Sequence, residues 1–246
     1  MPEISASRYL VTAGWRDVPH LDAKTQRELL ESTPPHLREA RSEGKPSLGS
    51  GAIYPVTWSS NEVQPFQLPA YWPRAYALDV GWNRTAALWG AWDRSDDTIY
   101  CYAEHYRGQA EPSIHAEAIK ARGPWIRGVI DPAARGRAQE DGRQLMATYQ
   151  QLGLNIMPAD NSVEAGIYEV WQRLSTGRIK FFSTLSNLRQ EYNIYRRDER
   201  GRIVKKNDHL MDALRYLVMS GKAVASVQMA ETGTPAAQIG DVKAGY

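Results

Sequence analysis

Apolar residues fall into short runs from about residue 71 onward, and their spacing predicts a sheet. The first three runs read "AYALDVGW", "TAALWGAW" and "TIYCYAEHY", and turns rich in Gly, Asn and Asp separate them. Short apolar runs joined by tight turns are typical of neighbouring antiparallel strands. We therefore expect this part of the chain to form a three-stranded antiparallel meander.

Helical and strand-like segments then alternate. Helical spacing is found in "SIHAEAIKARG", "EDGRQLMATYQQLG", "SVEAGIYEVWQRLSTG" and "LSNLRQEYNIY", and the strand-like runs between them are "WIRGVID", "LNIMPAD" and "KFF". Strands that alternate with helices pair in parallel and are covered by those helices. The pattern predicts an α/β fold with a mixed sheet, in which the antiparallel meander is followed by parallel strands and flanked by helices.

The two ends of the chain differ from this central part. Residues 1–70 are mostly polar, and helical spacing there is interrupted at Pro34-Pro35, which predicts a helical hairpin and linker. Residues 223–246 lack apolar periodicity, which predicts a mobile tail. The main domain is expected over residues 71–222.

Composition narrows the functional classes. The chain has 42% hydrophobic residues and no apolar run of membrane-spanning length, which favours a sizeable core and no membrane partner. Cys101 is its only cysteine, so an internal disulfide is excluded and a reducing compartment is favoured. The formal net charge is only +2, so any nucleic-acid site must be inferred from local charge.

Two aspartates belong to strand-like runs, one inside its run and one at the end. Asp79 interrupts the first apolar run of the meander, and Asp131 ends the run "RGVID". A carboxylate in a buried strand requires a partner, and the carboxyl ends of parallel strands are where open sheets bind ligands. Both residues also fit a simpler interpretation, in which each caps the turn that follows it.

A third group of acids lies on the predicted helix "KKNDHLMDALRYLVM". Asp208 and Tyr216 lie four residues to either side of Asp212 and share its face, which is unlike an ordinary solvent-exposed face. Asp208 also fits a helix N-cap, and His209 fits a surface histidine. Farther upstream, Asn161 and Glu164 have the spacing of a capping pair, which we prefer to a metal role for Glu164.

Asp79, Asp131 and Asp212 can converge at one sheet edge, where clustered carboxylates repel unless a cation lies between them. Oxygen-only ligands favour Mg²⁺ or Mn²⁺ over zinc, and the chain has neither a cysteine pair nor an HExxH motif. Two such ions support phosphodiester hydrolysis. We therefore predict a two-metal site at these three acids, with the nearby His209 as a residue that tunes a ligand or transfers a proton.

Basic residues are concentrated just before this helix. The stretch "YRRDERGRIVKK" has six basic and two acidic residues and contains a credible turn, so we expect a basic hairpin that contacts DNA phosphates. Its basic residues are Arg196, Arg197, Arg200, Arg202, Lys205 and Lys206. Arg135 and Arg137 follow Asp131 and fit either phosphate contact or a solvated loop. No base-reading pattern is present, so binding should be sequence-independent and sensitive to salt.

Four motifs in this order resemble a known family. The segments "LDVGW", "GVIDPAARGR", "SVEAGI" and "NDHLMDALRY" are similar to the nuclease domain of large terminase subunits of tailed phages, which has a ribonuclease H-like fold. The resemblance covers residues 71–220, and "DHLMDALRY" is its most specific element. It implies that Asp79, Asp131 and Asp212 each supply one metal-binding acid, with Asp208 and His209 in accessory positions.

The resemblance also implies a biological setting. It predicts cutting of concatemeric double-stranded viral DNA during genome packaging, in the cytoplasm of the infected bacterium. The implied partners are the terminase ATPase domain, the small terminase subunit and the portal. No GxxxxGK[ST] motif occurs in the chain, so we expect no ATP hydrolysis from it.

Other functional classes stay open at this point. A Holliday-junction resolvase or integrase-like nuclease would use the same three acids and would prefer branched DNA. A non-catalytic module that docks on DNA or a capsid would keep the fold without cleavage. If the acids are only caps, replacing them would leave cleavage unchanged.

Overall fold

The structure is a computed structural model, and it describes residues 3–5, 8–9, 14–19, 21–32, 42, 51–132, 141–198 and 200–228. In the N-terminal part, β1 (Glu3–Ser5) pairs antiparallel with β2 (Arg8–Tyr9), and η1 (Trp15–Asp17) and α1 (Ala23–Ser32) follow. Helix α1 corresponds to the first half of the predicted helical hairpin. The second half falls outside the described residues, as do residues 229–246 of the predicted tail.

Seven strands form the central sheet, in the order β3-β9-β6-β5-β4-β7-β8. The strands are β3 (Glu62–Val63), β4 (Arg74–Asp79), β5 (Thr85–Asp93), β6 (Thr98–Arg107), β7 (Arg127–Ile130), β8 (Ile156–Pro158) and β9 (Ile179–Phe182). Antiparallel pairing joins β4, β5 and β6, and parallel pairing adds the other four strands. The predicted meander and the parallel strands that follow it are confirmed.

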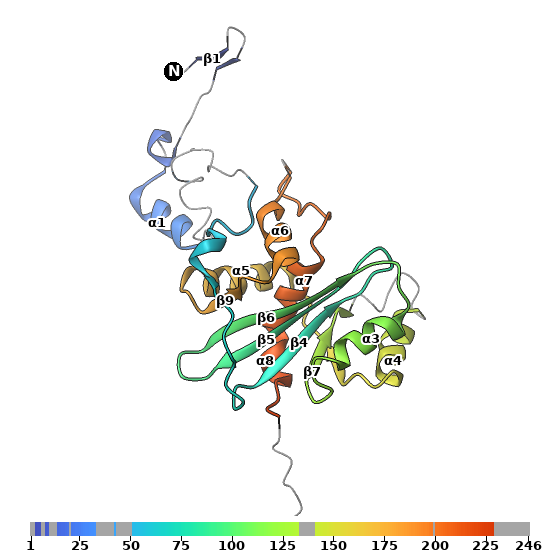
Figure 1. Cartoon of the computed structure of the whole chain (residues 1–246). Coiled ribbons are helices and arrows are strands. Elements are labelled where there is room, and N and C mark those ends of the chain that lie inside the picture. Colours follow the sequence, from blue (N-terminus) through green and yellow to red (C-terminus); the bar gives the residue numbers. More distant parts are fainter. Residues whose placement is uncertain are drawn as a thin grey trace, which may run out of the picture.

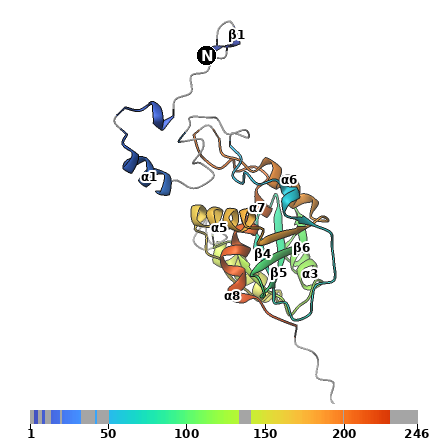
Figure 2. The ribbon, with the colours of Figure 1, turned by 90° about the vertical axis from the view of Figure 1, so that its left-hand side faces the viewer.

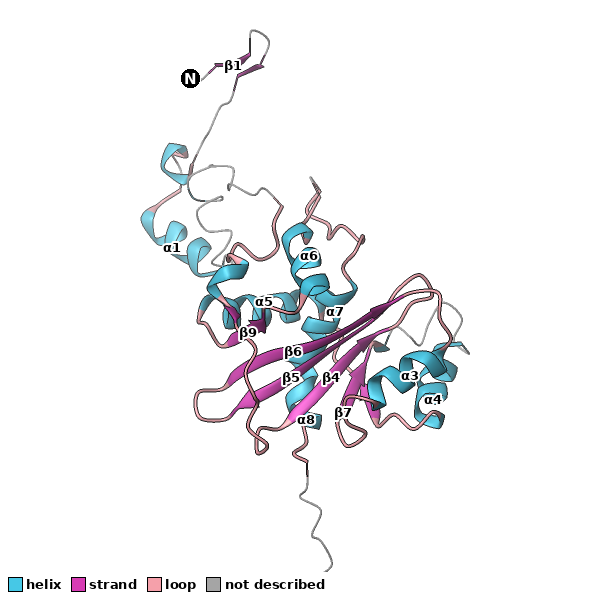
Figure 3. Ribbon diagram, in the orientation of Figure 1, coloured by secondary structure: helices cyan, strands magenta, loops and turns pink. Residues whose placement is uncertain are grey.

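Helices cover both faces of this sheet (Figures 1 and 3). One face packs against α3 (Pro112–Lys120) and α4 (Asp141–Gln151). The other packs against α5 (Val163–Ser175), α6 (Ser186–Ile194), α7 (His209–Tyr216), the π-helical η4 (Leu217–Gly221) and α8 (Lys222–Val224). Figure 2 shows α5, α7 and α8 on one side of the strands and α3 on the other. Every helix and strand predicted from residue 71 onward is present.

The segment that precedes the meander packs into the same core. Ile53 and Tyr54 are buried, and Trp58 in η2 (Trp58–Ser60) stacks on Phe181 of β9 with ring centroids 4.5 Å apart. Stacked aromatic pairs add to the free energy of burial. This segment is therefore continuous with the hydrophobic core.

Side-chain alternation along β4 assigns each residue to one face. Ala75 and Ala77 belong to the core beneath α5, α6 and α7, whereas Tyr76 and Leu78 belong to the core beneath α3 and α4. Because successive strand residues point to opposite faces, Asp79 shares the face of Ala75 and Ala77. The last residue of β4 thus points toward α7.

Small residues let the C-terminal helical segment lie close to the sheet. A Cβ atom at Gly90 of β5 would lie 2.9 Å from Leu217 Cδ2, which is too short for a real contact. Interiors are close-packed, so a larger residue here would push the segment away. The short distance between sheet and helix brings α7 within hydrogen-bond reach of the end of β4. None of the helices in the described ranges is long and apolar enough to cross a membrane.

Candidate active site

Two aspartates are neighbours at the carboxyl ends of the paired strands β4 and β7. Asp79 is the last residue of β4, and Asp131 directly follows β7. The parallel register pairs Leu78 with Ile130, and the Asp131 backbone N–H donates to the Leu78 carbonyl at 3.1 Å. This pairing continues the register by one residue, so Asp79 and Asp131 are neighbours, as the sequence predicted.

Glu191 fixes the start of α7 in front of these strands. This α6 residue is only 2% exposed, and its Oε2 accepts backbone N–H bonds from Leu210 at 2.6 Å and Met211 at 3.3 Å. Its Oε1 accepts a hydrogen bond from the Tyr106 hydroxyl at 2.6 Å. Because the first N–H groups of a helix have no partner within it, a buried carboxylate there stabilises both the helix end and its orientation.

Asp208 occupies the N-cap position of α7 but does not cap it. Its side chain makes no capping hydrogen bond, because Glu191 supplies that interaction from another helix. The capping interpretation of Asp208 is therefore wrong. Asp208 is 6% exposed, and its buried Oδ2 lies 3.0 Å from Lys205 Nζ in an ion pair but accepts no well-aligned hydrogen bond within the described part of the chain.

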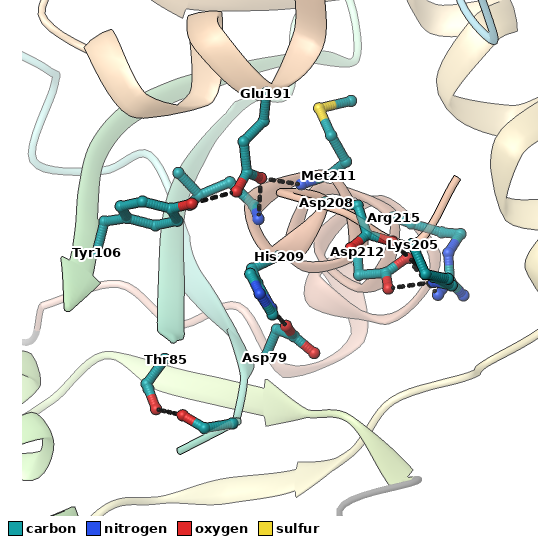
Figure 4. A network of polar contacts seen from close by, with 12 residues as sticks. Asp79, Thr85, Tyr106, Glu191, Lys205, Asp208, His209, Met211, Asp212 and Arg215 are labelled. Atoms are coloured by element: carbon teal, nitrogen blue, oxygen red, sulfur yellow. Dashed lines mark hydrogen bonds and ion pairs between the residues drawn. The ribbon is translucent and has the colours of Figure 1, made fainter. Parts of the chain in front are cut away.

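His209, the first residue of α7, points at Asp79 (Figure 4). Its Nδ1 lies 2.8 Å from Asp79 Oδ2 in a partly buried hydrogen bond. This bond raises the pKa of the imidazole against the opposing effect of burial. His209 is therefore a partly buried histidine paired with Asp79, and it does not lie on the open surface.

Asp212 is bound by two cations. Arg215 Nη2 donates to its Oδ1 at 3.0 Å, and Lys205 Nζ donates to its Oδ2 at 2.9 Å. Arg215 is 1% exposed, and its Nη1 donates to Asn161 Oδ1 at 3.0 Å. Lys205 Nζ also lies 3.0 Å from Asp208 Oδ2, in an ion pair. The side chain of Asp212 is 13% exposed, so this face of α7 is largely withdrawn from solvent.

The acids also influence one another through space. Burial raises the pKa of Asp79 to about 6; the bond to His209 opposes this shift, and the negative charges of Asp212 and Asp131 add to it. Burial raises the pKa of Tyr216, and Asp131, Asp212 and Asp79 raise it further while Arg215 lowers it. The three predicted acids thus lie within electrostatic reach of each other and of one tyrosine.

The donor set fits a hard divalent cation. Its atoms are carboxylate oxygens, and one of them, the buried Asp208 Oδ2, is held only by the Lys205 ion pair. Burial raises the pKa of Asp79, and the negative charges of Asp212 and Asp131 add to this shift. Within the described ranges, however, no three His, Cys, Asp or Glu side chains are already grouped for metal binding. Lys205 and Arg215 occupy Asp212, and His209 occupies Asp79. Metal binding here therefore requires some of these side chains to move.

The basic stretch before α7 forms the predicted hairpin. Arg197 and Ile203 form an antiparallel bridge, and the Asp198 backbone N–H donates to the Arg202 carbonyl at 2.8 Å. Arg196, Arg200, Arg202 and Lys206 are exposed, and these four make no ion pair with the described residues. Four cations are therefore available to an anionic partner beside the acids.

The remaining predictions concern phosphate contacts by Arg135 and Arg137 and the capping pair of Asn161 and Glu164. Arg135 and Arg137 lie outside the described residues. The predicted capping pair of Asn161 and Glu164 is wrong, because Ser162 is the N-cap of α5 and Asn161 binds Arg215 instead. Glu164 pairs with Arg197 of the hairpin at 2.7 Å.

Glu191 and Arg215 were not predicted as site residues, and Asn161 was predicted only as a cap. Arg215 follows Asp212 by three residues, a spacing at which opposite charges meet on a helix, so this contact had a local signal. Glu191 lies 19 residues before the Leu210 N–H that it binds and has no such signal. Its role depends on the packing of α6 against α7.

The sequence of this chain matches a known protein family and two curated proteins. A family model described as the terminase RNaseH-like domain matches residues 77–220, which include all the predicted acids and His209. The large terminase subunits of Enterobacteria phage LP7 and Salmonella phage P22 are each 32% identical over 223 residues. These alignments cover 86% of this chain but only 46% and 44% of the relatives. The chain thus spans a little less than half the length of these curated relatives.

Solved structures agree with the family match. The P22 large terminase nuclease domain is 30% identical with a TM-score of 0.68, and the alignment covers 72% of this chain and 95% of that domain. A large terminase from a thermophilic bacteriophage is 21% identical with a TM-score of 0.61 over 83% of this chain and 54% of its own, which shows a shared fold. The predicted ribonuclease H-like fold and the resemblance to terminase nuclease domains are confirmed. The chain belongs to the terminase RNaseH-like domain family.

Proposed function

We propose that this chain is a metal-dependent DNA endonuclease that cuts concatemeric viral DNA during genome packaging. The observation that carries the proposal is the meeting of Asp79, Asp131 and the α7 residues His209 and Asp212 at one sheet edge. The relatives named above are large terminase subunits, and one matched structure is a terminase nuclease domain. Fold alone would not give function, but this fold with these acids supports hydrolysis.

Each acid has a separate role in the proposed site. Asp79, Asp131 and Asp212 would hold two Mg²⁺ or Mn²⁺ ions, and Asp208 would support them with its buried Oδ2. Bound ions of this kind lower the pKa of water and stabilise the leaving oxygen of a phosphodiester. His209 orients the Asp79 carboxylate through their hydrogen bond and can hold a proton beside it.

The hairpin supports binding to the DNA backbone. Its exposed cations Arg196, Arg200, Arg202 and Lys206 lie just before α7, which places them next to the proposed cutting site. Lys205 and Arg197 would join them on release from their present carboxylate partners. Arg135 and Arg137 follow Asp131 in the sequence and would also contact phosphates. Such contacts position a duplex without reading its sequence.

The family suggests where this activity would operate. We propose that the partners are a terminase ATPase domain, a small terminase subunit and a portal, and that the reaction takes place in the cytoplasm of the infected bacterium. The names of the curated relatives support this setting.

The test is cleavage of supercoiled plasmid with Mg²⁺, Mn²⁺ or EDTA. Wild type should nick or linearise the plasmid only with a divalent metal. Asp79→Asn and Asp212→Asn should each lower the rate at least about 100-fold, because even outer-shell changes at metal sites lower activity 10- to 100-fold. Glu117→Gln changes an exposed acid on α3 and should cut like wild type.

Three results would contradict the proposal. Cleavage that survives Asp79→Asn would exclude the three-aspartate site. If the chain binds plasmid but does not cut it with any of the metals, it would instead be a docking module. Faster cleavage of a four-way junction than of linear duplex would identify a resolvase.

A further inference from the structure

Lys205 is positioned between the carboxylates where a metal ion would be expected. Its Nζ lies 2.9 Å from Asp212 Oδ2 and 3.0 Å from Asp208 Oδ2. The two carboxylates are 13% and 8% exposed, whereas the lysine side chain is 59% exposed. The ammonium thus enters a shielded acidic site from a side chain that is otherwise in solvent (Figure 4).

The second cation at this site is held much more firmly. Arg215 is 1% exposed and is fixed by Asn161 as well as Asp212. Lys205 has no second anchor besides these acids among the described residues, and it lies in the short segment between the hairpin and α7. Asn207 in this segment has a φ of +53°, a conformation that marks a sharp change of chain direction. Of the two cations, Lys205 is the one that can leave.

We propose that Lys205 competes with the divalent metal for Asp208 and Asp212, and that DNA phosphates withdraw it when the duplex binds. This inference rests on the proposed function and adds a mechanism for its regulation. Before DNA binds, Lys205 balances the charge of the two acids and weakens metal binding. With DNA on the hairpin, Lys205 turns to a phosphate, and the two carboxylates become available.

Metal binding and DNA binding are linked through Lys205, and each should strengthen the other. A divalent ion and an ammonium cannot occupy the same carboxylate oxygen, so removal of the ammonium must strengthen metal binding. If DNA strengthens metal binding by some factor, metal must strengthen DNA binding by the same factor. The metal would then be bound mainly when a substrate is present, which limits unwanted cleavage.

The first test is titration of Mn²⁺ without DNA, followed by the electron paramagnetic resonance of free Mn²⁺. Lys205→Met should bind Mn²⁺ about 3- to 10-fold more tightly than wild type, the scale of one or two partly exposed ion pairs. Lys206→Met is the matched control, because it removes an adjacent positive charge that contacts no carboxylate in the described structure. It should change the affinity by less than about 2-fold, since exposed charges are screened.

The second test adds a duplex with a phosphorothioate backbone that resists cleavage. The duplex should strengthen Mn²⁺ binding to wild type and have a smaller effect on Lys205→Met, whose competitor is already absent. Combining Lys205→Met with Asp212→Asn should abolish the gain in affinity, because the contested carboxylate is gone. Far-ultraviolet circular dichroism verifies that each variant is folded.

The outcomes separate this inference from the proposed function. Lys205→Met that binds Mn²⁺ no more tightly than Lys206→Met would overturn the inference alone. Wild type and Lys205→Met that both fail to bind Mn²⁺ would overturn the proposed function as well.

Discussion

The two ends of the acidic site balance their negative charge in different ways. Asp79 lies at the end of a buried strand and pairs with His209, whose pKa this hydrogen bond raises. Asp212 lies on α7 and pairs with Lys205 and Arg215, which stay charged. Burial raises the pKa of Asp79 to about 6, whereas carboxylate charge outweighs burial and raises the pKa of both Lys205 and Arg215.

This difference indicates how clustered acids can fold together without a bound cation. At the strand end, burial raises the pKa of Asp79 and so favours its protonated form, whereas on the helix two cations balance the charge of Asp212 by ion pairing. A cation can replace such a balancing group only if that group can leave the carboxylate. His209 can lose its proton and Lys205 can turn to solvent, whereas Arg215 is enclosed and keeps Asp212 in place.

The largest effect should come from removing the enclosed cation. Arg215→Ala should lower the free energy of unfolding by about 3–5 kcal/mol, because it leaves the Asp212 charge without its buried partner. Lys205→Ala should change it by no more than about 1 kcal/mol, as expected for an exposed ion pair. Urea denaturation of both variants measures the contrast. Equal losses would mean that Arg215 is not the firmly held cation and that Lys205 is not the mobile one.

At the strand end, the stability of the fold should depend on pH through Asp79, unlike at Asp212, whose partners stay charged. Asp79 has an ordinary pKa of 3.8 and a raised pKa of about 6 in the fold, so the folded state holds the extra proton. Its contribution is fully present below about pH 4 and is lost as pH rises through 6. His209 also has a raised pKa, and its contribution is likewise lost as pH rises. Wild type should therefore lose stability relative to Asp79→Asn, by up to about 3 kcal/mol between pH 4 and 7.

Urea titrations in EDTA across this range measure the pH effect. Glu117→Gln corrects for the loss of one negative charge at a remote exposed site. Parallel curves for wild type and Asp79→Asn would show that Asp79 ionises alike in the folded and unfolded chain, and the described difference between the two acids would not exist.

A smaller effect on stability should come from a larger side chain at Gly166 of α5, which packs against Arg215. A Cβ atom at Gly166 would lie 2.4 Å from Arg215 Cγ, and the enclosed side chain has little room to move. Alanine normally stabilises a helix relative to glycine by about 1 kcal/mol. Here Gly166→Ala should instead destabilise the fold by about 1–3 kcal/mol through overpacking.

A double-variant cycle provides the control for Gly166. Combined with Arg215→Ala, the Gly166 substitution should add little further loss, because the atom that it meets is gone. Thermal or urea unfolding gives the interaction free energy. Additive losses would show that Gly166 does not act through Arg215.

Much of the fold was predictable because its signals are local. The meander follows from three apolar runs and their turns, and the adjacency of Asp79 and Asp131 follows from the rule that parallel strands end at one edge. The acidic face of α7 followed from the four-residue spacing of Asp208, Asp212 and Tyr216. These features depend on residues close together in the chain or on the topology of the sheet.

The compensating interactions were not predictable in the same way. Glu191 caps α7 from α6, so Asp208 does not need to cap it, and Asn161 binds Arg215 across 54 residues of sequence. Arginine is seldom buried, so no pattern indicated that Arg215 would be enclosed. Such contacts depend on how helices pack, which a single sequence does not specify.

The proposed function depends on Asp79, Asp131 and Asp212 together forming one divalent metal site. The most direct measurement is a crystal structure with Mn²⁺, with the ion located by its anomalous scattering. We predict anomalous density bound by oxygens of all three aspartates, with Lys205 moved away from Asp212. Density elsewhere, or none at this edge of the sheet at saturating Mn²⁺, would contradict the claim.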